Sequence, residues 1–147
     1  MKRLQVLVLC TGNICRSPFA EIAIRQALAE QGIVAVVESA GTLGVPGNRC
    51  PEEAVQAARE FEIDLTRHRA QRLSAELLAK ATQLVVMEDA HLDAVARIAG
   101  EDPLLPWVDN WNVEDPYGRS PEFYAECYQQ LLELAADFAA ELRDELG

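Results

Sequence analysis

The sequence predicts a three-layer α/β/α fold, in which helices cover both faces of a four-stranded parallel β-sheet. Strand-like and helix-like segments alternate along the chain, and the first strand-like segment is apolar throughout. A parallel strand is buried on both faces, so it needs a continuous apolar run rather than an alternating one. No repeat or linker-like stretch interrupts the pattern, and residues 1–147 are predicted to form one domain.

The first strand is expected from Leu4 to Leu9, where turn-forming residues end the apolar run. A helix should follow, with Ser17 as its N-cap and Pro18 at its first position, and should end near Gly32. The other expected elements are a strand over 33–38, a turn-rich segment over 39–47, helices over 51–61, 75–80 and 88–99, short strands over 84–87 and 104–108, and a last helix with an apolar face from Phe123 to Leu142.

The composition is that of a globular protein with a large negative charge. Half of the residues (50%) are hydrophobic and 25% are charged, and no apolar run is long enough to span a membrane. The net charge of −11 argues against nucleic acid or an anionic membrane as a partner. Residues 1–10 lack a cleavage site after their apolar stretch, so a buried strand is expected there rather than a signal peptide. We therefore expect a cytoplasmic protein with reduced cysteines.

The loop after the first strand reads Cys10-Thr11-Gly12-Asn13-Ile14-Cys15-Arg16-Ser17. Gly12 and Asn13 tolerate positive φ, so the turn can point backbone N–H groups inward as an anion nest, and the following helix start adds its positive end. Arg16 supplies a planar fork that matches two phosphate oxygens. A cysteine at the rim of such a nest is expected to react as the thiolate, which is a nucleophile for phosphorus.

The Cys-x5-Arg spacing alone is a weak signal, because a strand-end cysteine is often plain packing and an arginine near a helix start is often solvated. The context strengthens it: a strand precedes the loop, and a Ser-Pro helix start follows it. A nucleotide-binding P-loop is a poor alternative, because no Gly-Lys-Ser/Thr sequence is present. The loop is therefore predicted to bind a phosphoryl group.

This loop resembles the signature of the low molecular weight protein tyrosine phosphatases, as do the later motifs Ser39-Ala40-Gly41-Thr42, His68-Arg69-Ala70 and Asp115-Pro116-Tyr117. The similarity covers essentially the whole chain. It implies a flavodoxin-like or Rossmann-like sheet with the phosphate loop after the first strand. It also implies a hydrolase that needs no metal or cofactor, acts on phosphorylated proteins, and releases inorganic phosphate, which also inhibits it.

The resemblance implies a role for each matching residue. Cys10 is the expected nucleophile, Arg16 binds phosphate oxygens and stabilises the transition state, and Asp115 is the general acid, then the base, around a cysteinyl-phosphate intermediate. Taken alone, an aspartate before a proline is more often a turn initiator. The other expected site residues are Thr11, Gly12, Asn13, Ile14, Cys15, Ser17 and Tyr117 around the substrate, with Ser39 and His68 as supporting hydrogen-bonding residues.

Two roles are open for Cys15. It is either inert packing or, as the resemblance implies, a partner for a reversible Cys10–Cys15 disulfide that protects the nucleophile. The histidines are isolated and the cysteines lack zinc spacing, so no metal site is expected. His91 is expected to be a surface residue of its helix.

Phosphotyrosine is the expected substrate, although the aromatic walls of the pocket look thin. Thr11 stands where the family commonly has leucine or isoleucine, and residues 43–49 contain no aromatic. Tyr117 is the main aromatic near the site, and Trp107 and Trp111 are expected in the core rather than at its rim.

Three other functions compete with this expectation. Thr11 resembles the bacterial branch of the family that dephosphorylates arginine, so a protein-arginine phosphatase is the main alternative. An arsenate reductase would need additional cysteines after the third strand, and none lies between Cys50 and Cys127. A non-catalytic phosphoprotein-binding module is disfavoured, because nucleophile, arginine and acid are all present.

Overall fold

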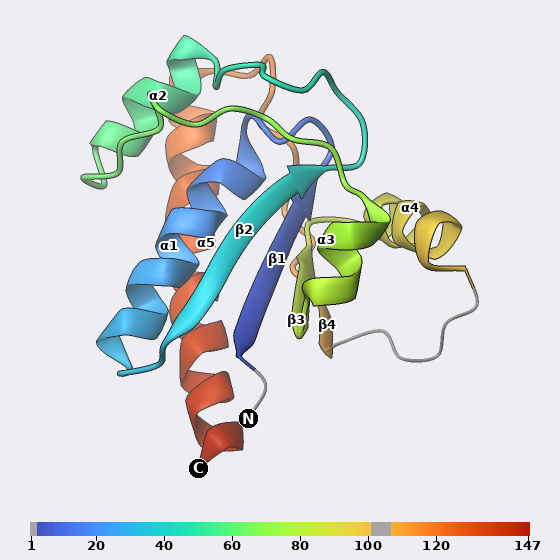
Figure 1. Cartoon of the computed structure of the whole chain (residues 1–147). Helices are drawn as coiled ribbons and strands as arrows, with labels where there is room; N and C mark the ends of the chain where they lie inside the picture. The colour runs from blue at the N-terminus through green and yellow to red at the C-terminus, as the bar shows by residue number, and fades with distance from the viewer. Residues whose placement is uncertain (1–2, 101–106) are drawn as a thin grey trace.

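The computed structural model describes residues 3–100 and 107–147, and the predicted three-layer architecture is confirmed (Figure 1). One parallel sheet of four strands has the order β2-β1-β3-β4. The strands are β1 Leu4–Cys10, β2 Ala35–Gly41, β3 Gln83–Val86 and β4 Trp107–Asn110. The helices are α1 Arg16–Glu30, α2 Glu52–Arg59, α3 Ala75–Lys80, α4 Asp89–Ala99 and α5 Pro121–Leu146.

Strand β1 separates two hydrophobic cores. Val6, Val8 and Cys10 belong to the core beneath α1, α2 and α5, whereas Leu7 and Leu9 belong to the core beneath α3 and α4 (Figure 1). Successive side chains of a strand point to opposite faces, which explains this division. The same alternation places Cys10 on the α1 face at the carboxyl end of the sheet, where ligands bind in open α/β folds.

The start of α1 differs from the prediction. The helix begins at Arg16, with Cys15 at the N-cap position and no side-chain cap, so Ser17 is not the N-cap and Pro18 is not the first helical residue. The Ser17 hydroxyl contacts Cys10 Sγ instead. Pro18 still lies in the first turn, where amides have no intrahelical acceptor, and its missing N–H is tolerated there.

The predicted boundaries of β2 were also wrong. The strand extends to Gly41, and residues 39–41 pair in register with the last residues of β1, ending at the Cys10–Gly41 pair. The composition of this segment suggests a turn, but pairing on a central strand makes it extended. A Cβ on Gly41 would lie 2.7 Å from the Thr11 carbonyl oxygen, so a larger residue would push the loop after β1 away.

Strand β4 forms one edge of the sheet, and the two tryptophans lie in it and directly after it. The strand expected over 104–108 is found at Trp107–Asn110, and residues 104–106 lie outside the described part of the chain. Both tryptophans pack edge-on against Phe138 of α5, at centroid distances of 6.0 Å for Trp107 and 6.3 Å for Trp111. The expectation of core packing is confirmed for Trp111, which is buried, whereas Trp107 is partly buried and packs against the edge of the core. No helix in the described ranges is long and apolar enough to cross a membrane.

Candidate active site

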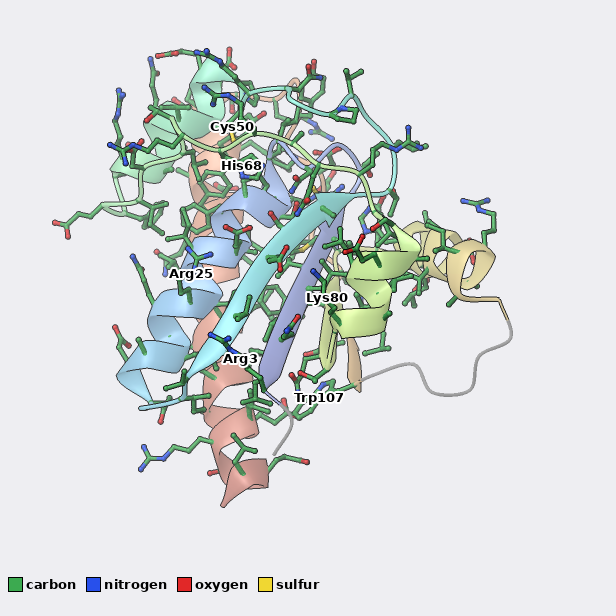
Figure 2. All side chains as sticks on the ribbon, viewed as in Figure 1. Arg3, Arg25, Cys50, His68, Lys80 and Trp107 are labelled. Atoms are coloured by element: carbon green, nitrogen blue, oxygen red, sulfur yellow. The ribbon has the colours of Figure 1, made fainter. Side chains whose placement is uncertain are left out.

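The loop between β1 and α1 lies at the carboxyl end of the sheet, where Figure 2 also places His68. Arg3 and Trp107 lie at the opposite end. A pocket of about 180 Å³ opens on this loop. Its lining consists of Cys10, Thr11, Gly12, Ile14, Cys15, Arg16, Asp115 and Tyr117. Residues separated by a hundred positions in the sequence are therefore gathered around one small cavity, as the sequence motifs predict.

Asn13 holds the loop in shape. It has a positive φ of 56° and is fully buried. Its side-chain amide donates to Ser17 Oγ at 2.8 Å and to Ser39 Oγ at 2.9 Å, while its Oδ1 accepts from the Gln71 backbone N–H at 2.9 Å. Every hydrogen-bonding atom of the amide is thus used, and three segments of the chain are joined at one residue.

These contacts orient a hydroxyl toward the nucleophile. Ser17 Oγ lies 2.9 Å from Cys10 Sγ. Because this oxygen already accepts from Asn13, its own hydrogen is free to be donated to the sulfur. Ser39 Oγ similarly accepts from Asn13 and donates to Glu21 Oε1 at 2.8 Å. A hydroxyl that donates to the sulfur suits a negatively charged Cys10.

His68 supports the loop from the other side. Its Nε2 donates to the Asn13 carbonyl oxygen at 2.7 Å, which fixes the proton on that nitrogen. Burial lowers the pKa of His68 below its ordinary value of 6.5, more than the Asn13 contact and Glu21 raise it. The ring is therefore held in its neutral form as a hydrogen-bond donor.

Arg16 is a buried cation whose hydrogen bonds are only partly filled. Its side chain is 1% exposed. Nη1 donates to the Val113 carbonyl oxygen at 2.8 Å and to Glu88 at 3.3 Å. Nη2 lies 3.3 Å from Thr11 Oγ1 and 3.7 Å from Asp115. Within the described residues the buried Nε has no partner. A buried donor without an acceptor is costly, so this edge of the guanidinium is suited to an anionic ligand.

His91 is buried, which corrects its expected position on the surface of the helix. It lies in the first turn of α4 and is 1% exposed. Nδ1 accepts from the Met87 backbone N–H at 3.2 Å, and Nε2 lies 3.1 Å from Thr11 Oγ1. The proton is therefore on Nε2, which donates to Thr11. Burial and then the Arg16 charge lower the pKa of His91, against the opposing effect of nearby carboxylates.

Asp115 lies at the pocket mouth in a defined orientation. Its Oδ1 accepts from the Tyr117 backbone N–H at 3.1 Å, so it is the turn residue that its sequence context indicates. The side chain remains 45% exposed, and Oδ2 faces Arg16 at 3.7 Å. Being a turn residue and facing the pocket are compatible, since only one carboxylate oxygen is used by the turn.

The second loop cysteine is oriented into the core. Cys15 Sγ lies 3.4 Å from the Tyr124 hydroxyl of α5, and burial raises the pKa of Cys15 to about 12. Burial likewise raises the pKa of Cys50 and of Cys127 to about 12. All four cysteines are free thiols in the structure. Of these, only Cys10 and Cys15 line the pocket.

Glu88 and His91 are the site residues that sequence reasoning missed. Both follow β3, whose carboxyl end lies beside that of β1. The rule that parallel strands present their following residues at one edge was the available signal. Across the described ranges, no group of three or more His, Cys, Asp or Glu residues is arranged to hold a metal ion.

The fold and the anion-binding loop together define the chain as a small phosphatase. More particularly, it belongs to the low molecular weight phosphotyrosine protein phosphatase family, whose sequence model matches residues 5–146. It is 32% identical over 145 residues to the low molecular weight protein-tyrosine-phosphatase Wzb of Escherichia coli K12, covering 95% of this chain and 96% of Wzb. The members of this family are hydrolases, and so is this protein.

Solved structures agree with this assignment. Vibrio vulnificus Wzb in complex with benzylphosphonate superposes with a TM-score of 0.84 at 29% identity, covering 95% of this chain and 99% of that one. The YwlE arginine phosphatase from Geobacillus stearothermophilus superposes equally well, with a TM-score of 0.84 at 26% identity and coverage of 97% and 94%. The fold is therefore shared by relatives with different named substrates.

Proposed function

We propose that this protein hydrolyses phosphotyrosine in proteins through a cysteinyl-phosphate on Cys10. One observation carries the proposal. Cys10, the buried Arg16 with its unpartnered Nε, and the exposed carboxylate of Asp115 line the same pocket. A nucleophile, an oxyanion-binding fork and a proton donor are the groups that transfer of a phosphoryl group to sulfur requires.

In the first step, Cys10 Sγ attacks phosphorus in line with the leaving oxygen. The S–P bond forms, the P–O bond breaks, and Asp115 gives its proton to the departing tyrosine oxygen. Arg16 and the backbone amides of the loop hold the equatorial phosphate oxygens, where negative charge is spread in the transition state. The Ser17 hydroxyl, 2.9 Å from the sulfur, stabilises the thiolate before attack.

In the second step, water replaces tyrosine on the same side of phosphorus. The Asp115 carboxylate takes a proton from the water as its oxygen bonds to phosphorus, and the S–P bond breaks. Inorganic phosphate leaves and Cys10 returns to the thiolate. Because Asp115 is partly exposed and fixed by Tyr117 N–H, water can reach it without a change in its orientation.

The walls of the pocket favour an aromatic substrate. Ile14 and Tyr117 line its sides and offer apolar and aromatic surface to a phenyl ring. The oxygen of Thr11, the basis of the arginine alternative, already receives hydrogen bonds from His91 and Arg16. That oxygen therefore orients Arg16 and has little left to offer a guanidinium. The benzylphosphonate bound by V. vulnificus Wzb, an aromatic ring next to a phosphonate, supports the same choice.

The test compares kcat/KM on matched peptides that carry phosphotyrosine or phosphoarginine. We expect phosphotyrosine to be preferred, and Thr11→Ile to slow both reactions without reversing the order. A preference for phosphoarginine that Thr11→Ile reverses would establish the alternative. Cys10→Ser is the control, since it should bind phosphate without turnover. Binding of both peptides by the wild type without hydrolysis would instead identify a non-catalytic phosphoprotein-binding module.

A further inference from the structure

Beside the pocket lies a positively charged surface on an otherwise acidic protein. The chain has a net charge of −11, yet residues 39–51 and 65–75 contain no aspartate or glutamate. They carry four exposed arginines, which we call the basic rim: Arg49, Arg67, Arg69 and Arg72. An anionic substrate that approaches the molecule therefore meets opposite potentials on different faces.

The two segments form one continuous surface. The Gly47 N–H donates to the Ala70 carbonyl oxygen at 2.8 Å, and the Ala70 N–H donates to the Asn48 carbonyl oxygen at 2.9 Å. The Gly41 N–H donates to the Gln71 carbonyl oxygen at 2.8 Å. Backbone pairing thus holds both loops together, so the arginines are presented by a fixed scaffold and not by two independent loops.

The rim adjoins the phosphate loop directly. The Leu43 N–H donates to the Thr11 carbonyl oxygen at 2.8 Å, and the Thr42 N–H donates to the Cys10 carbonyl oxygen at 3.0 Å. His68, between two rim arginines in the sequence, donates to the Asn13 carbonyl oxygen. We therefore expect a polypeptide whose phosphorylated residue enters the pocket to pass over this surface on one side.

The guanidinium groups of the rim are free to bind an anion. In the described part of the chain, none of the rim arginines forms an ion pair with a carboxylate. Arg69 alone is held by its own turn, through hydrogen bonds from Nη1 to the carbonyl oxygens of Thr66 and His68. The other side of the pocket is different in charge, since it carries Glu88 and Glu114 beside Asp115.

We infer that the basic rim binds carboxylate side chains next to the phosphorylated residue of the substrate, so that the preferred substrate is an acidic polypeptide segment. This inference rests on the proposed function. Exposed charges are screened beyond about 10 Å at ~0.1 M salt, so a peptide in contact with the rim is shielded from carboxylates on the far faces of the molecule. Arginine forks also match carboxylates in geometry. The charge difference across the pocket gives the bound segment a direction, with its acidic residues over the rim.

The experiment uses two phosphotyrosine peptides that differ only in flanking residues, with Asp and Glu in one and Asn and Gln in the other. At low salt we expect kcat/KM to be about tenfold higher for the acidic peptide, chiefly through KM, because several exposed charge pairs act together. At ~0.5 M salt this preference should largely disappear. Equal kcat/KM for the two peptides, or a preference that salt does not alter, would overturn the inference.

A matched pair of variants locates the effect. The triple substitution Arg49→Gln, Arg67→Gln and Arg72→Gln should remove the preference for the acidic peptide. The control Arg3→Gln, Arg97→Gln and Arg143→Gln makes the same change in net charge away from the pocket and should retain the preference. Retention of the preference in the folded rim variant would overturn the inference.

Turnover of para-nitrophenyl phosphate separates this inference from the proposed function, because that substrate has no flanking residues. If the wild type hydrolyses para-nitrophenyl phosphate and also hydrolyses the two peptides with equal kcat/KM, only the rim assignment fails. If the wild type hydrolyses none of them, the proposed function fails, and the rim assignment with it. Should the rim variant not fold, the salt dependence of the wild-type preference decides the question alone.

Discussion

The Nε2 of His91 donates a hydrogen bond of 3.1 Å to the hydroxyl of Thr11, which is 80 positions away in the sequence. The same hydroxyl oxygen lies 3.3 Å from Nη2 of Arg16. His91 does not line the pocket, but through Thr11 it fixes one of the acceptors that orient the guanidinium. Thr11 thus acts as a link between a buried histidine and the phosphate-binding arginine.

A double-mutant cycle tests this link. His91→Asn should keep an acceptor for the Met87 N–H, but its shorter side chain should not contact Thr11. Thr11→Val removes the hydroxyl and keeps the shape of the side chain. Each should lower kcat/KM by about tenfold, roughly 1.4 kcal/mol, as expected for one hydrogen bond to an oriented group. The double variant should be little worse than either single variant, because both remove one contact. Fully additive losses would show that the two residues act separately.

The two histidines should make stability depend on pH. Burial lowers the pKa of both His68 and His91 below 6.5, whereas the unfolded chain keeps the ordinary value. Between the lowered pKa and 6.5 the unfolded state binds more protons, so the free energy of unfolding rises with pH through this range and falls on acidification. Urea unfolding at acidic and neutral pH measures the change. His68→Gln and His91→Gln should each reduce the difference between the free energies of unfolding at the two pH values. An unchanged difference would contradict the lowered pKa of that histidine.

The loss of kcat on replacing Asp115 should depend on the leaving group of the substrate. Asp115→Asn cannot donate the proton, so kcat for a substrate with a poor leaving group should fall by about 10²–10⁴. A substrate such as para-nitrophenyl phosphate, whose leaving group needs little protonation, should lose less. The measurement is kcat for a series of aryl phosphates that differ in the pKa of the phenol. A loss of the same size across the series would remove Asp115 from the role of acid.

The proposed Cys10–Cys15 switch makes a chemical prediction. Hydrogen peroxide oxidises the Cys10 thiolate to a sulfenic acid. The Cys15 sulfur can then attack the Cys10 sulfur, so that the S–S bond forms, the S–O bond breaks and water leaves. Cys15 must first leave its contact with Tyr124, 3.4 Å away. Activity lost to peroxide should return with dithiothreitol in the wild type and should return less completely in Cys15→Ser. The switch is ruled out if reductant restores nothing in the wild type.

Local sequence patterns predicted the parts of the molecule that local interactions determine. The apolar run of β1 and the glycine and asparagine after it each depend on a few neighbouring residues. The motifs around Cys10, Arg16 and Asp115 placed the pocket at the correct edge of the sheet, because parallel strands end together.

The remaining features depend on contacts between distant segments. Nothing near His91 in the sequence indicates that its ring turns toward Thr11, since this requires β3 to lie beside β1. The Ser39–Gly41 segment has the composition of a turn and becomes a strand only because β1 pairs with it. Ser17 resembles an N-cap, but its hydroxyl is used by Cys10 and Asn13. In each case tertiary contacts outweigh local preference.

The position of Asn13 has a consequence for folding. Its side chain joins the first helix, the end of β2 and the segment at Gln71, so the loop keeps its shape only while these distant segments are docked. Local opening of any one of them should disorder the nucleophile's surroundings, even if the rest of the sheet stays intact. Catalytic activity in denaturant should therefore disappear no later than the β-sheet signal, and bound phosphate should slow exchange of the Gln71 amide hydrogen.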